Sequence, residues 1–552
     1  MNVAEIVGKT LATLGAGYCF GVVGSGNFVV TNALVKNGVP FTAARHEGGA
    51  ASMADAYSRV SGKVALVSVH QGCGLTNAGT GIGEAAKSRT PMIVLAAEAA
   101  PSAVYSNFAM DQDGFAASVY AVPERVHSAE SAIADTIRAY RRATNERRTV
   151  VLNLPLNIQG LEVTEDPEAA PLGVAAVEPI RPSPGSVEAL ANLLAGAQRP
   201  VFVAGRGGRG AKEEILALAR HTGALVATSA VAKGLFNEDE FDLGISGGFS
   251  SPLAAELITD ADLIVGFGCA LNMWTMRQGS LIGQDTKVVQ IDLEVQALGA
   301  NRAIDLGVVG DSAQCATDVL EALSTENGQA REGYRNASVA ERISQSIHWQ
   351  QVGFQDLSDG RYIDPRVLTK QLDEMLPTER IVSVDSGNFM GYPSQFLSVP
   401  DEFGFCFTQA FQSIGLGLPS AIGAALARPD RLPVLGTGDG GFHMAIAELD
   451  TAVRLGLPLV CIVYNDAAYG AEVYHFEEDV PQDDLGIVSF PDTDFAALGR
   501  GFGADGITVR DVADLEHVRE WLSTAPSRPL VIDAKIASDG GSWWLAEAFR
   551  GH

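Results

Sequence analysis

The stretch LPVLGTGDGGFHMAIAELDTAVRLGLPLVCIVYNDAAYG, residues 432–470, decides the fold of this chain. Its first residues, Leu432–Leu435, form a short apolar run that ends in a glycine-rich turn, as a buried strand does. Apolar residues then recur at helical spacing, and Gly456-Leu457-Pro458 closes the helix. A second apolar run, Leu459–Tyr464, has the character of a strand. We therefore expect a strand–helix–strand unit with parallel strands and a right-handed crossover.

Polar residues follow both strands of this unit. Parallel strands joined by a helix end at the same edge of a sheet, so Asp439 and Asn465 can converge there. A carboxylate and an amide oxygen suit a hard divalent cation that keeps water and phosphate oxygens as its other ligands. The glycines around Asp439 let the backbone approach closely, and the next helix presents free N–H groups to an anion; these glycines are Gly438, Gly440 and Gly441. The sequence therefore predicts a site for Mg²⁺ and a diphosphate.

An isolated Gly-Asp-Gly is usually only a turn. Here it lies between a strand and a helix, and Asn-Asp-x-x-Tyr-Gly follows the next strand, which makes the pattern far more specific. Gly438-Asp439-Gly440 followed by Asn465 resembles the thiamin diphosphate motif of the acetolactate synthase, pyruvate oxidase and decarboxylase superfamily. The resemblance implies thiamin diphosphate and Mg²⁺ as cofactors. It also implies Asp439 and Asn465 as Mg²⁺ ligands, with the main-chain carbonyl of Ala467 as a third. The family usually has Asn-Asn or Asn-Asp-Asn here, so Asn465-Asp466 is a mild variant.

Further cofactor contacts are implied by the same resemblance. Asp385-Ser386-Gly387-Asn388 looks like the family's cofactor-contact segment, and Phe411–Pro419 resembles the stretch whose bulky apolar residue bends the cofactor into a V shape. Ile414 is the expected wedge, and an ordinary core isoleucine is the alternative. The residues expected beside the cofactor, besides those at the metal, are Gly387, Asn388, Ser413, Ile414, Gly438, Gly440, Gly441, Tyr469 and Gly470.

Composition limits the function classes. A chain of 552 residues with 47% hydrophobic and 19% charged residues is too long for one core, and three or four domains are expected. A net charge of −27 argues against nucleic acid or an anionic membrane as partner. The six cysteines form no CxxC pair, which fits reduced thiols. The N-terminus lacks the basic region of a signal peptide, and the longest uncharged apolar stretch, Leu263–Met276, is too short to span a membrane. We expect a cytoplasmic enzyme.

The chain alternates strand and helix patterns three times, which indicates an α/β fold of three consecutive doubly wound parallel-sheet domains. By the resemblance these are a pyrimidine-binding domain (1–165), a middle domain (186–325) and a diphosphate-binding domain (360–552), separated by polar or proline-rich linkers. Besides the two strands above, the predicted strands are Phe20–Val23, Val39–Ala44, Val64–Val69, Pro91–Ala97, Thr149–Leu154, Pro200–Ala204, Ala224–Thr228, Leu263–Phe267, Lys287–Ile291 and Ile381–Val384.

Glu47 is the candidate catalytic residue of the first domain. Alone, a glutamate after a strand is a helix-start residue favoured by the helix dipole. Together with the diphosphate motif, the segment Arg45–Arg59 resembles the superfamily's activating-glutamate segment. There the glutamate hydrogen-bonds the aminopyrimidine ring of the cofactor and favours the imino tautomer that deprotonates the thiazolium carbon. An apolar setting keeps such a carboxyl able to hold or share a proton.

Three weaker candidates surround Glu47. His70 lies where benzoylformate decarboxylase-like enzymes carry an active-site histidine; a hydrogen-bonded histidine at a strand end is an equal alternative. Ser25 matches a substrate-contacting serine of those enzymes, and Gln112 resembles the pocket glutamine of benzaldehyde lyase and acetolactate synthase; the alternative is that they are ordinary polar residues of a turn or of the surface. Tyr474 and His475 either face the substrate or have core and surface roles.

The middle domain carries the glycine-rich turn Gly205–Gly210, which lacks the G-x-G-x-x-G order of a dinucleotide fingerprint. Because this domain binds FAD in some relatives and nothing in many, a structural role is favoured over FAD. The C-terminal tail, with Trp543, Trp544, Phe549 and His552, either closes over the site as a helix or packs on the body.

The resemblance covers nearly the whole chain and implies an acetolactate synthase-like carboligase that acts on a 2-oxo acid through an enamine intermediate. His70 and Ser25 keep a 2-oxo-acid decarboxylase or an acyloin (benzaldehyde-type) lyase as the alternative. A flavin-dependent oxidase and a non-catalytic thiamin diphosphate-binding protein are further alternatives, and retention of Glu47 argues against the last. In the family, the activating glutamate and the diphosphate site of one cofactor belong to different subunits. A homodimer or a dimer of dimers is therefore expected, in which Glu47 and Asp439 act together and a monomer is inactive.

Overall fold

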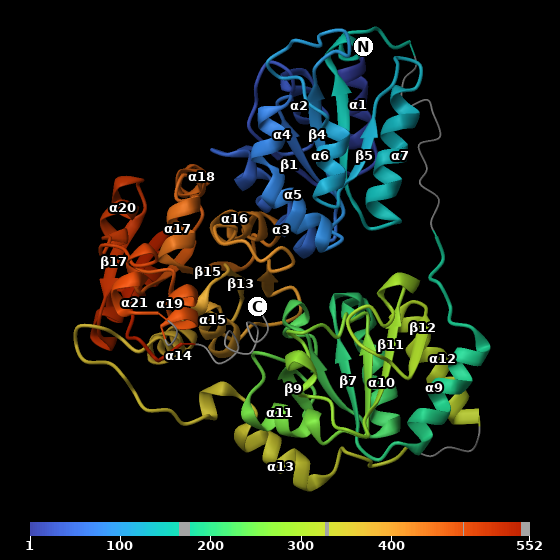
Figure 1. The fold of residues 1–552 in the computed structure, drawn as a ribbon, viewed down its shortest axis with the longest axis vertical. Helices are drawn as coiled ribbons and strands as arrows, with labels where there is room; N and C mark the ends of the chain where they lie inside the picture. Colours follow the sequence, from blue (N-terminus) through green and yellow to red (C-terminus); the bar gives the residue numbers. More distant parts are fainter. Residues whose placement is uncertain (165–176, 326–329, 478–479, 542–552) are drawn as a thin grey trace.

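The computed structural model describes residues 1–164, 177–325, 330–477 and 480–541. Within them lie three six-stranded sheets, in which all strand pairs are parallel, one after another along the chain. Figure 1 shows the N-terminal sheet in blue, the middle sheet in green and the C-terminal sheet in orange and red, each flanked by helices. The predicted fold class, three doubly wound parallel-sheet domains, is confirmed.

The N-terminal sheet has the strand order β2-β1-β3-β4-β6-β5. Its strands are β1 (Tyr18–Gly21), β2 (Phe41–Ala43), β3 (Ala65–Val69), β4 (Met92–Glu98), β5 (Val122–Arg125) and β6 (Thr149–Pro155). The helices between them include α1 (Val3–Thr13), α2 (Phe28–Lys36), α3 (Glu47–Ser61), α4 (Cys73–Asn77), α5 (Gly79–Lys87), α6 (Gln112–Ser118) and α7 (Ala132–Thr144). Strand β5 was not predicted, because only four residues form it and its Pro-Glu-Arg sequence lacks an apolar run.

The C-terminal sheet repeats this topology strand for strand, with the order β14-β13-β15-β16-β18-β17. Its strands are β13 (Arg380–Val384), β14 (Phe405–Phe407), β15 (Leu432–Gly438), β16 (Val460–Asn465), β17 (Asp505–Val509) and β18 (Leu530–Lys535). Its helices include α14 (Pro365–Met375), α15 (Gly391–Phe396), α16 (Gly417–Ala427), α19 (Gly470–Phe476), α20 (Phe495–Gly501) and α21 (Glu516–Ser523). The single crossover helix predicted after β15 is two helices, α17 (Asp439–Ala445) and α18 (Glu448–Arg454).

The middle sheet has a different order, β12-β11-β10-β7-β8-β9. Its strands are β7 (Pro200–Ala204), β8 (Leu225–Thr228), β9 (Asp242–Ile245), β10 (Leu263–Phe267), β11 (Lys287–Asp292) and β12 (Leu306–Val309), with α9 (Pro184–Gly196), α10 (Lys212–Thr222), α11 (Pro252–Thr259) and α12 (Ser312–Thr325) among its helices. Helix α13 (Ala337–Ser346) lies in the segment that leads to the C-terminal sheet. The predicted closing tail lies outside the described residues.

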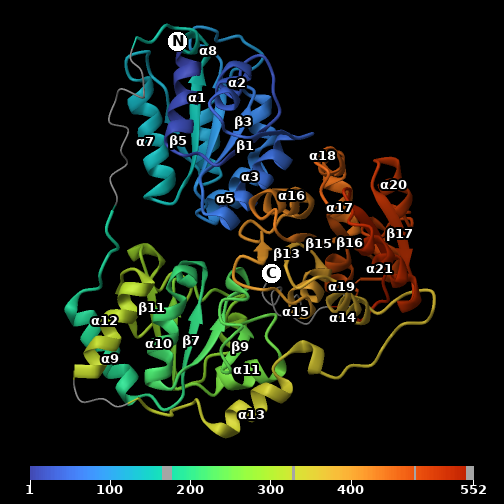
Figure 2. The same cartoon turned by 180° about the vertical axis from the view of Figure 1, so that it is seen from behind.

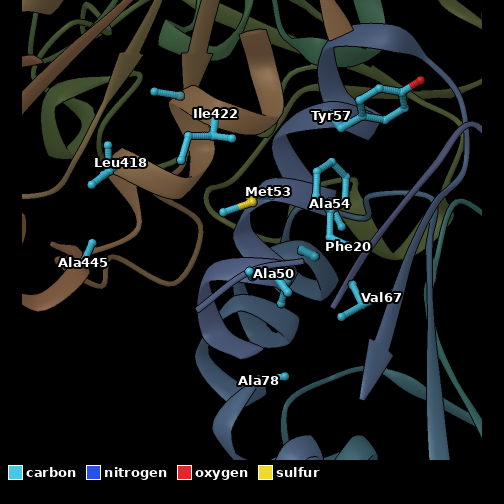
Figure 3. Packing of buried hydrophobic residues seen from close by; sticks show 14 of the residues in the cluster. Phe20, Ala50, Met53, Ala54, Tyr57, Val67, Ala78, Leu418, Ile422 and Ala445 are labelled. Carbon is cyan, nitrogen blue, oxygen red and sulfur yellow. The ribbon is translucent and has the colours of Figure 1, made fainter. Parts of the chain in front are cut away.

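The N-terminal and C-terminal lobes share one hydrophobic core, and both Figure 1 and Figure 2 show α3 and α16 side by side between them. In Figure 3, Ala50 and Met53 of α3 face Leu418 and Ile422 of α16. Small residues allow this close approach: a Cβ on Gly423 would collide with the main-chain carbonyl of Met53. The two lobes are therefore held at a contact that leaves no room for a larger residue.

In the part of the chain that the structure describes, no helix has both the length and the apolarity needed to cross a membrane.

Candidate active site

Two carboxylates meet where β15 and β16 end. Asp439 is the first residue of α17, and Asp466 directly follows β16. Their side chains are hydrogen-bonded to each other, and the main-chain N–H of Ala468 donates to both. Burial raises the pKa of both carboxyls, and the negative charge of Asp439 raises the pKa of Asp466 further. A divalent cation would neutralise this buried pair of acids.

Asn465, a predicted Mg²⁺ ligand, has its carboxamide bound elsewhere. Its Nδ2 donates to Asp533 Oδ1 at 2.9 Å and to the carbonyl of Thr493 at 3.2 Å, and its Oδ1 accepts the N–H of Ala467 at 3.1 Å. These bonds lead toward β18 and the segment before α20. The structure thus pairs Asp439 with Asp466, not with Asn465, because consecutive residues at a strand end project to opposite sides.

The carbonyl of Ala467, the third predicted ligand, accepts the main-chain N–H of Phe490 at 2.7 Å. Ala467 itself has a positive φ of 57°, which forms the turn that Asn465 Oδ1 closes. Ala467 therefore has a part in the turn, and Asp466, which was not predicted as a site residue, lies beside Asp439. The raised pKa of a carboxyl beside Asp439 is the structural signal for it.

Glycines surround the acid pair where other residues come close. A Cβ on Gly440 would lie 2.6 Å from the ring of Tyr469, and a Cβ on Gly470 would collide with the Asp466 carboxylate. A Cβ on Gly438 would lie 3.1 Å from the ring of Phe389. The predicted contacts Gly438, Gly440, Tyr469 and Gly470 are thus all brought to the end of β15.

Asp385, which follows β13, connects three predicted cofactor segments and was not singled out as a site residue. Its carboxylate accepts the N–H of Ser386 at 2.8 Å, the N–H of Gly415 at 3.0 Å and the hydroxyl of Thr437 at 3.1 Å. Burial raises its pKa to about 6. Gly441 must be a glycine here, since a Cβ would collide with the Asp385 carboxylate.

These bonds tie the segment that carries Gly387 and Asn388 to the one that carries Ser413 and Ile414. Gly387 has a φ of 144°, and Asn388 is buried. Ile414 is half-buried and belongs to none of the hydrophobic core clusters of the described residues, as a residue left to contact a ligand would be. The Ser413 hydroxyl donates to the carbonyl of Ile414 at 3.1 Å.

Glu47 is the first residue of α3 and is half-buried. Its Oε2 accepts Asn77 Nδ2 at 3.0 Å, and His46 caps the helix by accepting the Gly48 N–H at 3.0 Å. A Cβ on Gly74 would lie 3.4 Å from Glu47 Oε1 and 3.2 Å from the Cβ of His70, so Gly74 separates the two candidate residues by a narrow gap.

Ser25 and His70 meet, as their proposed roles require. Ser25 Oγ lies 3.4 Å from His70 Nε2, and the imidazole packs edge-on against Phe108 at 4.9 Å between ring centroids. Ser25 is exposed and His70 half-buried, so both can reach a small molecule.

Gln112, the fourth candidate of the N-terminal lobe, hydrogen-bonds to its own lobe. It is buried, its Oε1 accepts the N–H of Gly72 at 3.0 Å, and its Nε2 donates to Asn153 Oδ1 at 2.7 Å. Gly72 has a φ of 63°, and a Cβ there would lie 2.7 Å from the carbonyl of Phe108. Gln112 therefore supports the loop that carries His70.

The remaining candidates point elsewhere. Tyr474 Oη lies 2.7 Å from Ser538 Oγ, close to the end of the described chain, and His475 packs against Phe476. In the middle domain, Arg209 of the glycine-rich turn donates to the carbonyls of Arg59 and Val231, which joins the turn to the N-terminal lobe.

The residues present fit Mg²⁺ and a diphosphate. Two acids, Asp439 buried and Asp466 half-buried, supply charge for the cation, glycines leave space beside them, and Gly438 and Gly440 flank Asp439 at the start of α17. Glu47 and the Asp439–Asp466 pair belong to two topologically equivalent lobes, so a ligand contacted by both would need to span an interface.

Three family models match successive parts of the chain. Residues 1–117 match the thiamine pyrophosphate enzyme N-terminal TPP binding domain, residues 187–323 the central domain, and residues 385–534 the C-terminal TPP binding domain.

Curated relatives match almost end to end. A sulfoacetaldehyde acetyltransferase of Castellaniella defragrans is 27% identical over 93% of this chain and 89% of its own length. A probable acetolactate synthase large subunit of Methanocaldococcus jannaschii is 28% identical over 97% of this chain and 92% of its own. A probable 2-ketoarginine decarboxylase of Pseudomonas aeruginosa is 28% identical over 94% of this chain and 91% of its own length.

Proposed function

Because the chain belongs to the thiamine pyrophosphate-dependent enzymes, we propose that it is a Mg²⁺-requiring carboligase of the acetolactate synthase type that acts on a 2-oxo acid. The observation that carries the proposal is the pair of half-sites, Glu47 at the start of α3 and the Asp439–Asp466 pair at the end of β15 and β16. When bound, thiamin diphosphate supplies the carbon nucleophile and electron sink for making or breaking a bond next to a carbonyl.

The protein residues would hold and orient this cofactor. Asp439 and Asp466 would bind the Mg²⁺ that carries the diphosphate, and the glycines around Asp439 would let the backbone approach it. Ile414, half-buried behind the loop that Asp385 anchors, would support the middle of the cofactor. Glu47 would bind the pyrimidine ring and hold or pass its proton there.

The substrate would enter beside Ser25 and His70. Their 3.4 Å contact specifically favours a second candidate function, a 2-oxo-acid decarboxylase or acyloin lyase, because an imidazole and a hydroxyl can bind a carboxylate or move a proton to a product carbon. The named relatives are an acetyltransferase, a probable acetolactate synthase and a probable decarboxylase, which supports this pair of candidates.

We further propose a homodimer or a dimer of dimers in which the partner subunit completes each site. Glu47 is only half-buried in one chain, whereas its proposed role favours exclusion of water. Large apolar side chains are exposed close to both half-sites; they are Val23, Phe28, Val29, Phe411 and Met444.

The experiment that tests the function is turnover of a panel of 2-oxo acids and acyloins with thiamin diphosphate and Mg²⁺, with products identified by mass. Wild type and Glu47→Gln are measured side by side. Acetolactate or another coupled product, lost in the variant, would establish the carboligase. Free aldehyde as the main product would establish the second candidate instead, and equal rates in both proteins would contradict the role of Glu47.

A further inference from the structure

Two buried glutamates reach across the interface between the N-terminal and C-terminal lobes. Glu448, the first residue of α18, accepts the main-chain N–H groups of Arg45 and His46, both at 3.0 Å, with its Oε1. These are the two residues directly before Glu47. The carboxylate of one lobe thus holds the loop that delivers the candidate catalytic glutamate of the other.

Glu84 of the N-terminal lobe likewise accepts main-chain N–H groups of a loop in the C-terminal lobe. Its Oε1 accepts the N–H of Ala410 at 3.0 Å and its Oε2 accepts the N–H of Phe411 at 2.6 Å. This loop leads to Ser413 and Ile414. The positions are equivalent in the two repeated sheets: α5 and α18 each precede the fourth strand of their lobe in chain order, and the two held loops precede α3 and α16.

An arginine adds further hydrogen bonds beside each glutamate. Arg59 donates to Glu84 Oε1 at 2.7 Å and to the carbonyl of Phe407 at 3.1 Å. Arg454 donates to the carbonyl of Ala43 at 2.6 Å and to Thr451 Oγ1 at 3.1 Å, and Thr451 in turn donates to Glu448 Oε2 at 2.7 Å. Ala43 and Phe407 are the last residues of β2 and β14, so each lobe binds the same place in the other.

Burial makes these contacts strong and specific. Glu84 is 1% exposed and Glu448 is 2% exposed, so neither carboxylate can exchange its main-chain donors for water. The loops also fit closely around them: a Cβ on Gly49 would collide with the Glu448 carboxylate, and a Cβ on Gly83 would lie 2.8 Å from the ring of Phe411.

We propose that Glu84 and Glu448 are positioning residues that couple the two half-sites: each fixes, from its own lobe, the loop that presents cofactor-facing residues on the other. The assignment of those loops to a cofactor rests on the proposed function. The hydrogen bonds of Glu84 and Glu448 to main-chain N–H groups of the other lobe, which we call the clamp, do not involve a cofactor. They can be tested without measuring turnover. Displacement of one loop is transmitted to the other lobe through the same carboxylate, arginine and strand end.

The test compares Glu448→Ala, Glu448→Gln and Glu84→Ala in the full chain, with Glu256→Ala as control. Glu256 is also a helical glutamate in an ion pair, with Arg342, but its side chain is 62% exposed and far from either loop in the sequence. Glutamine at 448 can still accept both N–H groups with its oxygen and donate to Thr451, so it should rescue the clamp without the charge. Should Glu448→Ala not fold, Glu448→Asp replaces it, because the shorter side chain loses the reach while keeping the charge.

Amide hydrogen exchange followed by mass spectrometry measures the clamp directly. In Glu448→Ala we expect exchange at Arg45 and His46 to rise by about tenfold or more, with Ala410 and Phe411 less affected, and the reverse in Glu84→Ala. Glu448→Gln and Glu256→Ala should keep wild-type exchange at both loops. Unchanged exchange at Arg45 and His46 in Glu448→Ala, or equal exchange in the alanine and glutamine variants, would overturn the proposal.

Cofactor binding and turnover separate positioning from mere stability. With thiamin diphosphate and Mg²⁺, Glu448→Ala should lower kcat by about tenfold while the cofactor Kd, from fluorescence quenching, changes little. Glu84→Ala should weaken cofactor binding by a similar factor, because its loop touches the cofactor in the ground state. Equal losses in Kd and kcat for both variants would overturn the assignment of the two loops. If wild type binds no cofactor, the proposed function fails, and the exchange data still decide the clamp.

Discussion

At the residue scale, the neighbouring residues Asn465 and Asp466 have side chains with different partners. Asn465 binds Asp533 of β18 and closes the turn at Ala467. Asp466 shares a hydrogen bond with Asp439 and has a raised pKa because it is buried beside another acid. Two buried acids in contact destabilise the metal-free protein when both are ionised, and a cation reverses this cost.

Asp466→Asn should therefore stabilise the metal-free protein and reduce the gain from Mg²⁺. Above pH 8, the approximate value to which burial and the charge of Asp439 raise the pKa of Asp466, both acids are ionised and the variant removes one of two repelling charges, which we expect to raise the free energy of unfolding in EDTA by about 1–2 kcal/mol. Urea unfolding with EDTA and with excess Mg²⁺ measures both effects. Asn465→Ala is the matched comparison: it should lower stability equally in both buffers, and loss of the Mg²⁺ response in Asn465→Ala alone would show that Asn465 is the ligand.

At the element scale, the contact between α3 and α16 sets the relative position of the N-terminal and C-terminal lobes of one chain. Both helices begin next to a candidate site segment, Glu47 on one and Gly415 on the other, and they pack through small and aliphatic residues (Figure 3). Gly423 is a tight point of this contact, because a Cβ there would collide with the carbonyl oxygen of Met53.

Gly423→Ala should push the two helices apart and destabilise the protein, although alanine favours a helix over glycine. We expect a loss of about 1–3 kcal/mol, since the added methyl group meets backbone and not a side chain that can move. Thermal unfolding measures it. Gly196→Ala in α9 is the control, because a Cβ there meets nothing within 4 Å and should be neutral or stabilising. Equal melting temperatures for the two variants would contradict a tight α3–α16 contact.

At the scale of the whole molecule, single side chains join the middle domain to the other two. Lys233 of the middle domain is one of them. Its Nζ donates to the carbonyl of Ser394 at 2.7 Å and to the carbonyl of Leu397, which follows α15. The same Nζ lies 5.1 Å from the ring centroid of Phe405. A cation at the C-terminal end of a helix is favoured by the helix dipole.

Lys233→Met should leave these carbonyls without a donor while keeping the apolar stem. We expect a loss of about 2–3 kcal/mol in the free energy of unfolding, measured with urea. Lys287→Met is the control, because Lys287 has a 58% exposed side chain in a surface ion pair with Asp305. A loss no larger than that of the control would mean that Lys233 does not hold the domains together.

The proposed dimer predicts complementation between two inactive subunits. Glu47→Gln and Asp439→Asn subunits, co-expressed with different tags and purified as the mixed dimer, should regain about half of wild-type activity, because one of the two sites then contains both intact residues. Each homodimer of a single variant should be inactive. No recovery in the mixed dimer would place Glu47 and Asp439 of the same chain at one cofactor.

The sequence by itself determined the three parallel-sheet domains, and it predicted the ends of β15 and β16 as a place for a cation and a diphosphate. Hydrophobic period, glycine turns and strand–helix alternation are local properties, and they suffice for these conclusions. Only the tertiary structure decided that Asp466 and not Asn465 lies beside Asp439, that Gln112 supports the His70 loop, and that Asp385 ties three segments together. It alone also placed Glu84 and Glu448 on main-chain groups more than three hundred positions away. The physical reason is that a side chain's direction at a strand end and its partners across a domain interface depend on packing between distant segments, which no local pattern records.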